Sequence, residues 1–337
     1  MNEKRDVVFT IRGLNKYFGP THANKNVDFE LCRGEIRGLI GENGSGKSTL
    51  ISQIAGIYPP DSGEMRIGGE LYAPASPLDA YDRKISMVLQ ELGVVGTLPV
   101  GVNVFLGRTK QFTKGGVVDL KALNRAAQAV FEKWDLPMPP LNASPGTMLI
   151  ESRKMVELAR ALSLEPNILL LDEVTQSLSM NNREKLYALL RRLKAEDRSA
   201  IVITHDVEEM LRITDTVTVL RDGEVVGYGY AAPHRTRAAY QWSVETSIYV
   251  AQEQHRHGIA GAIYAALFEL LTMQGYYNIY VGITSPNERS MKFHKAMGFI
   301  ISGAYQESMY KFGQWRDVLW MGKSLRPHDG APQPTVP

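Results

Sequence analysis

The sequence predicts an α/β fold for residues 1–223, built around a strand, a glycine-rich loop and a helix in that order. The apolar run EIRGLI (35–40) leads into GENGSGKST (41–49), and STLISQIAG continues with helical periodicity. Short β-rich runs then alternate with helical stretches up to residue 223, which is typical of an α/β fold. The strand–loop–helix order is the setting in which a phosphate-binding loop functions.

The loop residues themselves favour binding of a nucleoside triphosphate. Glycines let the backbone wrap closely around an anion, Lys47 can reach the β- and γ-phosphates, and the Ser48 hydroxyl can ligate Mg²⁺. The helix that begins near Lys47 adds its positive N-terminal end. Before this strand lies Phe18, or its neighbour Tyr17, where a ring can stack on adenine. The expected loop contacts are Gly41, Asn43, Gly44, Ser45, Gly46, Lys47, Ser48 and Thr49.

Polar residues at the ends of later apolar runs complete the predicted nucleotide site. ILLLDE (168–173) reads as a buried strand that ends in Asp172, suited to Mg²⁺ binding, and Glu173, suited to polarising the attacking water. SAIVITHD (199–206) is the next strand, and its His205 can contact the γ-phosphate. Gln90 follows another apolar run and can sense Mg²⁺ and the attacking water. Taken singly, Gln90 and His205 are also compatible with ordinary surface positions.

Composition limits the classes of protein to which the chain can belong. The 337 residues are 44% hydrophobic and 22% charged, which is typical of a folded protein long enough for two domains. A net charge of +2 gives no sign of a nucleic-acid partner. The single cysteine, Cys32, fits a reducing cytosol. No apolar stretch is long enough for a signal peptide or a membrane span, so we expect any membrane role to involve a partner.

Residues 5–223 resemble the ATP-binding subunit of ABC transporters, in particular the first nucleotide-binding domain of bacterial sugar importers. The resemblance rests on RKMVELARALSLEPNILLLDE, THDVEEMLRITDTVTVLRDG and VLQELGVVGTLPVGVNVFLGR. It implies ATP and Mg²⁺ as ligands, with Ser48, Gln90 and Asp172 at the metal and Glu173, Gln90 and His205 in hydrolysis. It also implies membrane permease subunits, a second ATP-binding domain and a peripheral position on the inner face of the plasma membrane.

The chain departs from this family at the signature loop, which should read like LSGGQ. Its serine is expected 23 residues before the aspartate, and that position holds Leu149 in MLIES (148–152). Leu149 has no hydroxyl to donate to a γ-phosphate, and Glu151 would bring a carboxylate towards it. Ser144-Pro145-Gly146 resembles the motif but lies five residues too early. We therefore expect the chain to load ATP but to be a poor signature donor.

From residue 224 the predicted order changes to two strands, a helix (259–274), a strand, a helix (287–297) and two strands. This part resembles GNAT N-acetyltransferases of the phosphinothricin type, and the resemblance rests on ITSPNERSMKFHKAMGF and KFGQWRDVLWMGK. The resemblance implies an α+β fold, acetyl-CoA as cofactor and a small amine as acceptor. Glu245 would act as general base, and His294 would act as its partnering acid or base. The residues expected to face acetyl-CoA are Tyr249, Val250, Arg256, Gly258, Ala260, Gly261, Asn287 and Ser290.

The join between the two halves leaves three functions open. A full GNAT domain begins with a strand, two helices and another strand, which are missing here. Asp222-Gly223 is a good two-residue turn, so VTVLRDGEVVGYG can both end the first half and open the second as a hairpin. We expect an ABC-type domain at 1–223, an N-terminally truncated GNAT domain at 224–325 and a disordered tail at 326–337. The leading function is ATP hydrolysis for sugar import; the alternatives are amine acetylation and non-hydrolytic regulation by ATP.

Overall fold

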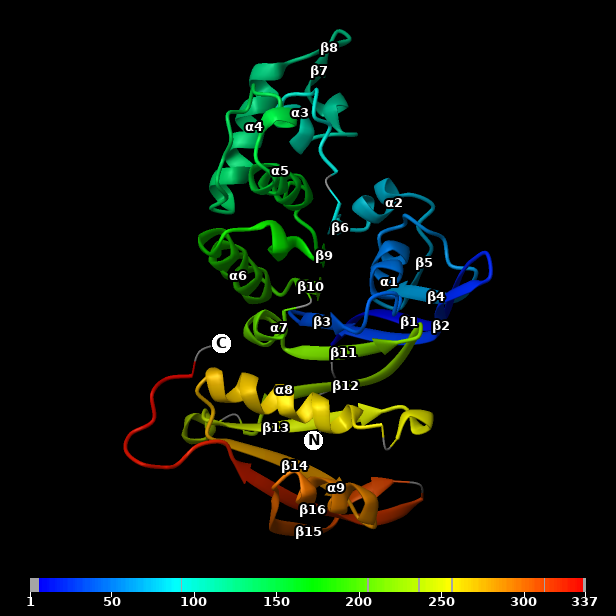
Figure 1. Ribbon diagram of the computed structural model, residues 1–337, viewed down its shortest axis with the longest axis vertical. Helices are drawn as coiled ribbons and strands as arrows, with labels where there is room; N and C mark the ends of the chain where they lie inside the picture. Colours follow the sequence, from blue (N-terminus) through cyan, green and yellow to red (C-terminus); the bar gives the residue numbers. More distant parts are fainter. Residues whose placement is uncertain are drawn as a thin grey trace. The chain divides into compact units, whose positions relative to one another are not determined.

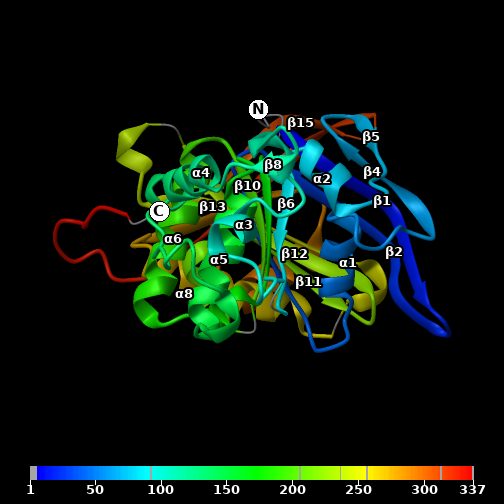
Figure 2. The ribbon, with the colours of Figure 1, turned by 90° about the horizontal axis from the view of Figure 1, so that it is seen from above.

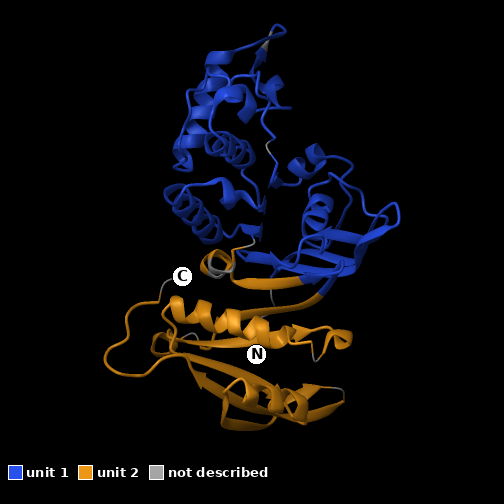
Figure 3. Ribbon diagram, viewed as in Figure 1, with its two compact units in different colours: residues 1–205, 220–225 blue, residues 206–219, 226–337 orange. Residues whose placement is uncertain are grey.

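The computed structural model describes residues 6–91, 93–204, 206–235, 237–255, 257–311 and 313–335. It divides the chain into two compact units (Figure 3). The first unit comprises residues 1–205 and 220–225, and the second comprises residues 206–219 and 226–337.

A parallel sheet forms the centre of the first unit. Its strands lie in the order β3-β10-β9-β6 (Figure 1), with bounds β3 Ile36–Ile40, β10 Ser199–Ile203, β9 Ile168–Asp172 and β6 Ile85–Val88. Ile203 pairs with Leu39 on one side and with Asp172 on the other, so β3 and β9 end at the same edge. That register brings the loop after β3 close to the carboxylates after β9.

A second, antiparallel sheet lies against helix α1 (Lys47–Ile54). Its strands are β2 Thr21–Cys32, β1 Val7–Phe18, β4 Ser62–Ile67 and β5 Glu70–Tyr72, in that order. Leu50 and Ile54 of α1 are fully buried in one core with Phe9 of β1, Met65 of β4 and Leu170 of β9. Figure 2 shows α1 beside β1 and β2. The helix that follows the glycine loop is thus fixed between two sheets.

Further helices of the first unit surround the parallel sheet or extend beyond it. They are α2 Pro77–Asp82, α3 Val100–Val104, α4 Leu120–Lys133, α5 Ile150–Leu162 and α6 Met180–Ala195, with the small hairpin β7 Thr113–Lys114 and β8 Val117–Val118. The Pro-rich stretch 135–146 forms no helix or strand except the start of a short 3₁₀ turn at Pro145.

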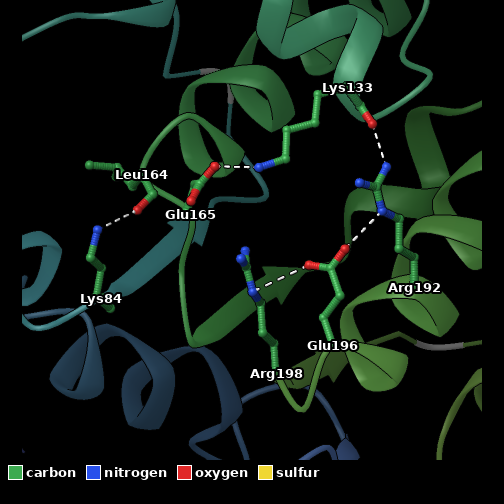
Figure 4. Close-up of polar contacts among 7 residues, drawn as sticks. All are labelled: Lys84, Lys133, Leu164, Glu165, Arg192, Glu196 and Arg198. Carbon is green, nitrogen blue, oxygen red and sulfur yellow. Dashed lines mark hydrogen bonds and ion pairs between the residues drawn. The ribbon is translucent and has the colours of Figure 1, made fainter.

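A hydrogen bond from the Arg192 guanidinium to Lys133 O connects α6 to the end of α4, and ion pairs surround it (Figure 4). Lys133 pairs with Glu165, and Glu196 pairs with both Arg192 and Arg198. The guanidinium of Arg192 lies 4.7 Å from the centre of the buried Trp134 ring. Most of these charged groups are partly exposed, so each pair contributes little alone, whereas the ring and its cations bury apolar area.

The second unit contains one sheet whose strands lie in the order β12-β13-β14-β16-β15. Their bounds are β12 Glu224–Pro233, β13 Ser243–Val250, β14 Asn278–Thr284, β16 Gln314–Ser324 and β15 Ile300–Lys311. Helices α8 (Ile259–Met273) and α9 (Glu288–Ala296) share a core with its strands, and α7 (Val207–Ile213) lies beside α8. This order of strands and helices matches the order predicted from sequence.

Strand β11 (Thr216–Arg221) leads into β12 through the predicted two-residue turn. Asp222 and Gly223 have φ angles of 51° and 85°, the left-handed conformation that tight hairpin turns require. Residues 325–335 contain no helix or strand, although Trp242 Nε1 donates to Gln333 O at 2.7 Å.

Candidate functional sites

The glycine loop between β3 and α1 is the first candidate site. Gly46 caps α1 with φ 96°, and a Cβ there would lie 2.4 Å from Ala23 O. A Cβ on Gly41 would lie 2.2 Å from Leu220 O. Around Gly44, by contrast, nothing lies within 4 Å of a Cβ. The loop therefore packs tightly on its inner side and is open at its tip.

Lys47 lies inside the loop, where a phosphate group would be expected. Its Nζ donates to Gly41 O at 2.8 Å and to Glu42 O at 2.9 Å. Burial lowers the pKa of Lys47, and the carboxylates of Glu173 and Asp172 oppose that shift. The nearby Ser45 Oγ is buried and has no hydrogen-bond partner. A buried hydroxyl with an unmet hydrogen bond and a lysine held among carbonyls fit an anion bound in this loop.

Oxygen donors suited to Mg²⁺ meet beside the loop. Ser48 Oγ lies 3.3 Å from Asp172 Oδ1, and Asp172 is 3% exposed. A hydroxyl and a carboxylate are hard ligands of the type that Mg²⁺ prefers. Among the described residues, no group of three or more His, Cys, Asp or Glu side chains forms a metal site. The residues present fit a magnesium ion that would complete its coordination with phosphate and water.

Glu173 follows β9 in a strained conformation and is held by two amides. Its φ is 50°, and its backbone N–H donates to Ile203 O at 3.0 Å. Gln90 Nε2 donates to Glu173 Oε2 at 2.7 Å, and Gln176 Nε2 donates to the same oxygen at 3.1 Å. The structure thus brings the predicted Gln90 and Glu173 together. Gln176 was not predicted, because only the fold places it beside the carboxylate.

Phe18 lies at the end of β1, where it is 41% exposed. Its ring makes an edge contact with Tyr58, 5.2 Å between ring centres, and Tyr17 stacks on His22 at 4.0 Å. Both predicted rings are therefore accessible for stacking. Predicted His205 lies outside the described residues.

The signature position presents apolar side chains and a carboxylate that already has partners. Leu149 caps α5 and is 78% exposed. Glu151 Oε1 accepts from Ser179 N at 2.6 Å and from Asn182 Nδ2 at 2.7 Å. These hydrogen bonds from Ser179 and Asn182 hold the pKa of Glu151 below its usual range. The Glu151 carboxylate thus accepts hydrogen bonds from the start of α6.

The second candidate site is a cavity of about 690 Å³ in the second unit. Strands β13 and β14 pair only from Ser243–Asn278 to Glu245–Tyr280 and then diverge. Residues of β13, of the start of α8 and of α9 line the cavity. Among them are the predicted residues Val250, Gly258, Ala260, Gly261, Asn287, Ser290 and His294.

The start of α8 leaves room for a ligand backbone or phosphate. Gly258 caps the helix with φ 79°, and nothing lies within 4 Å of a Cβ built on Gly258 or Gly261. The helix N-terminus and the open cavity wall fit an anionic cofactor such as coenzyme A. Predicted Arg256 lies outside the described residues, and the Tyr249 ring stacks on Tyr228 rather than lining the cavity.

His294 reaches the cavity but already uses both ring nitrogens. Nδ1 lies 2.7 Å from Ser290 O, which can only accept, so Nδ1 carries the proton. Nε2 then accepts from the Tyr264 hydroxyl at 2.8 Å, and that hydroxyl is 3.4 Å from Thr246 Oγ1. Burial raises the pKa of Tyr264 to about 12 and lowers the pKa of His294. Tyr264 was not predicted, since it lies within an apolar helical stretch.

Glu245 is not brought to His294. Side chains alternate along a strand, so Glu245 lies on the opposite face of β13 from Thr246, which contacts Tyr264. Burial raises the pKa of Glu245, and Arg235 opposes the shift. The two predicted catalytic groups therefore lie on different sides of the sheet, at the point where β13 and β14 separate.

Comparisons with known proteins identify the families that these two sites resemble. A family model described as ABC transporter matches residues 24–176, and one described as acetyltransferase (GNAT) domain matches residues 212–320. Both predicted resemblances, and the fold classes they imply, are confirmed. The second match begins within the segment that we assigned to the first domain.

The similar curated proteins are import ATP-binding proteins. A putative ribose/galactose/methyl galactoside import ATP-binding protein 1 of Burkholderia cenocepacia is 37% identical over 222 residues, 66% of this chain and 42% of the relative. Ribose import ATP-binding protein RbsA 1 of Rubrobacter xylanophilus is 41% identical over 217 residues, 64% of this chain and 43% of the relative. The chain thus spans less than half the length of these relatives.

Solved structures confirm the fold of the first part. A dimeric bacterial ABC transporter cassette has a TM-score of 0.57 and 28% identity, covering 64% of this chain and 96% of the cassette. A nucleotide-free ATP-binding cassette of an ABC transporter has a TM-score of 0.57 at 23% identity, covering 66% and 91%. Among the described residues, no helix is both long and apolar enough to cross a membrane.

The lowered pKa of His294 predicts a pH-dependent stability of the second unit. In the unfolded chain His294 protonates near pH 6.5, above its folded pKa, so protons favour unfolding. His294 should therefore lower the free energy of unfolding as the pH drops below 6.5, and this one residue contributes at most about 1.4 kcal/mol per pH unit. Urea denaturation, followed by tryptophan fluorescence in a Trp134→Phe background, measures it. His294→Gln should make this slope shallower, leaving the part due to His234, whose pKa burial also lowers. Exposed His257→Gln should keep the parental slope; equal slopes in all three proteins would contradict the assignment.

Proposed function

We propose that the chain is the ATP-binding subunit of a sugar-type ABC importer, which hydrolyses Mg-ATP together with partner chains. The observation that carries the proposal is the meeting of the Lys47 loop, Asp172, Glu173 and Gln90 at one edge of the parallel sheet. The ribose and galactose import proteins that resemble this chain supply the sugar class. On this proposal the protein is cytoplasmic and associates with a membrane permease.

Each residue has a defined role at the site. Loop N–H groups and Lys47 hold the β- and γ-phosphates, and Ser48, Asp172 and Gln90 hold Mg²⁺, which supplies charge neutralisation when bound. Glu173 orients and polarises the attacking water. Phe18 stacks on adenine, and His205 contacts the γ-phosphate.

Lys47→Ala should weaken Mg-ATP binding by about 10- to 100-fold, because a charge-assisted hydrogen bond to phosphate is lost. Isothermal titration calorimetry with Mg-ATP measures the change. The exposed Lys121→Ala, on α4, serves as the matched control and should bind as the parent does. Equal affinities of Lys47→Ala and the parent would rule out the phosphate assignment.

The signature defect predicts slow hydrolysis by the isolated chain. Two copies would have to complete each other's sites, and Leu149 and Glu151 offer a γ-phosphate neither a hydroxyl nor a close backbone approach. Leu149→Ser with Glu151→Gly should raise turnover, and with Glu173→Gln added it should form an ATP-dependent dimer in size-exclusion chromatography. The parent carrying Glu173→Gln alone should stay monomeric with ATP. Rapid hydrolysis by the parent that is lost in Glu173→Gln would show that the signature defect is unimportant.

A second candidate function is acetyl-CoA-dependent N-acetylation of a small amine, which the cavity at the start of α8 favours. The cavity offers the glycine surface for a pyrophosphate, and the diverging strands β13 and β14 offer backbone groups to a pantetheine arm. Glu245, with its raised pKa, would take the proton of the amine. A third candidate, a regulator that binds ATP without hydrolysing it, is favoured by the contacts of Glu151.

We expect acetyl-CoA to bind the second unit while acetyl transfer stays slow. Positioning the amine supplies a large share of the rate in such reactions, and the truncation predicted from the sequence removes the helices that would wall the acceptor pocket. Calorimetry with acetyl-CoA measures binding of the cofactor, and thiol release with phosphinothricin-like amines measures acetyl transfer. Gly258→Val should reduce binding, whereas Gly303→Val, at another open glycine, should not. Fast transfer abolished by Glu245→Gln would make acetylation the main function; no binding would exclude it.

A further inference from the structure

A buried lysine of helix α5 holds the backbone of the segment that carries Gln90. Lys154 is 1% exposed, and its Nζ donates to Leu89 O at 2.7 Å and to Gln90 O at 3.3 Å. The same ammonium lies 2.7 Å from Glu157 Oε2, one helical turn further on. Lys154 therefore connects α5 to the residue whose side chain contacts Glu173.

Two further side chains on this side of α5 hold the continuation of the segment. The other oxygen of Glu157 accepts the N–H of Gly93. Arg160 Nη1 donates to Gly93 O at 2.8 Å, and its Nε donates to Asn103 O at 2.7 Å. Positions 154, 157 and 160 recur every three residues, so they lie along one side of the helix. Side chains of α5 thus hold the backbone at Leu89, Gln90 and Gly93.

We propose that Lys154 is a positioning residue for ATP hydrolysis, because it fixes the backbone of Gln90 so that the Gln90 amide stays on Glu173. The inference rests on the proposed ATPase function. Lys154 would thereby preserve the 2.7 Å hydrogen bond from Gln90 Nε2 to Glu173 Oε2. A shift of the Gln90 backbone would break that contact, and with it the placement of an amide beside both the carboxylate and the metal.

Stability alone does not account for a charged pair at this place. Removing an ammonium and a carboxylate from water is costly, and apolar residues of similar size are often at least as stabilising as a buried ion pair. The carbonyl oxygens of Leu89 and Gln90 need donors, however, and the Lys154 ammonium supplies a hydrogen bond to each. The pair lies one turn inside a helix that begins after Leu149. A partner that contacts this end of α5 would therefore act on Gln90 through a single rigid turn.

The test compares Lys154→Met, Lys154→Arg and Gln90→Ala, each alone, with the Lys154→Met, Gln90→Ala double variant. Lys154→Met alone leaves the Glu157 carboxylate buried without the Lys154 ammonium, which destabilises the fold. The Lys154→Met, Glu157→Leu double variant removes both charges and so controls for that effect. Exposed Lys121→Met is the matched control. Calorimetry gives the Kd for Mg-ATP. Phosphate release from radiolabelled Mg-ATP, with protein in excess, gives the rate of hydrolysis in a single turnover. The release measured with Glu173→Gln is subtracted as background.

We expect Lys154→Met, with or without Glu157→Leu, to slow phosphate release about tenfold while Kd stays within about twofold, since the phosphate loop is untouched. Lys154→Arg should recover most of the rate. The double variant should be no slower than Gln90→Ala, because both changes remove one interaction. A parental rate in Lys154→Met, or losses that multiply in the double variant, would overturn the inference.

Amide hydrogen exchange of residues 88–95 gives a second readout that needs no turnover. Lys154→Met should raise exchange of this segment by about tenfold or more, while exchange of 168–173 stays unchanged. Unchanged protection of 88–95 would overturn the inference even if the parent releases no phosphate. A parent that fails to bind Mg-ATP would instead refute the proposed function, and calorimetry shows this separately.

Discussion

The close approach of backbone carbonyls to the glycine loop is the constraint on which the nucleotide site depends. Leu220 O and Ala23 O lie where a Cβ on Gly41 or Gly46 would be. The turn at Gly223 closes this packing, since its N–H donates to Ser45 O at 3.2 Å and its carbonyl accepts from Lys25 N at 2.7 Å. A loop fixed in this way would bind a phosphate without reorganising. Its position also fixes where α1 begins and places Ser48 beside Asp172.

The phosphate-binding side of the first unit and its signature position, at the start of α5, differ in how complete they are. On the proposed function, the loop and the carboxylates after β9 would bind and hydrolyse Mg-ATP from one chain. The start of α5 is less complete, because Glu151 already satisfies the N–H of Ser179 and the amide of Asn182. A chain with this asymmetry fits a partner whose own signature loop is intact. In that pairing the site on this chain's Lys47 would be completed, whereas the opposite site would not.

Local patterns predicted much of the molecule, and tertiary placement explains what they missed. The strand, loop and helix around Lys47 were predictable because all their determinants lie within a few consecutive residues. Gln176 and Lys154 were not, because their roles depend on a loop and a helix that only the fold brings together. Glu245 and His294 were predicted as partners from family resemblance. The alternation of side chains along β13 places Glu245 and His294 on opposite faces of the sheet. The sequence alone did not show this, because it does not tell on which face α8 and α9 pack.

The divergence of β13 and β14 after Glu245 and Tyr280 gives the second unit an edge inside its own sheet. Among the described residues, no strand pairs with 246–250 on the side away from β12. Exposed strand edges attract other extended chains, which is why proteins cover or shorten them. Two residues of that edge, Ile248 and Val250, line the cavity at the start of α8. An extended, amide-bearing ligand in that cavity would lie beside these unpaired backbone groups and could bond to them as a neighbouring strand does.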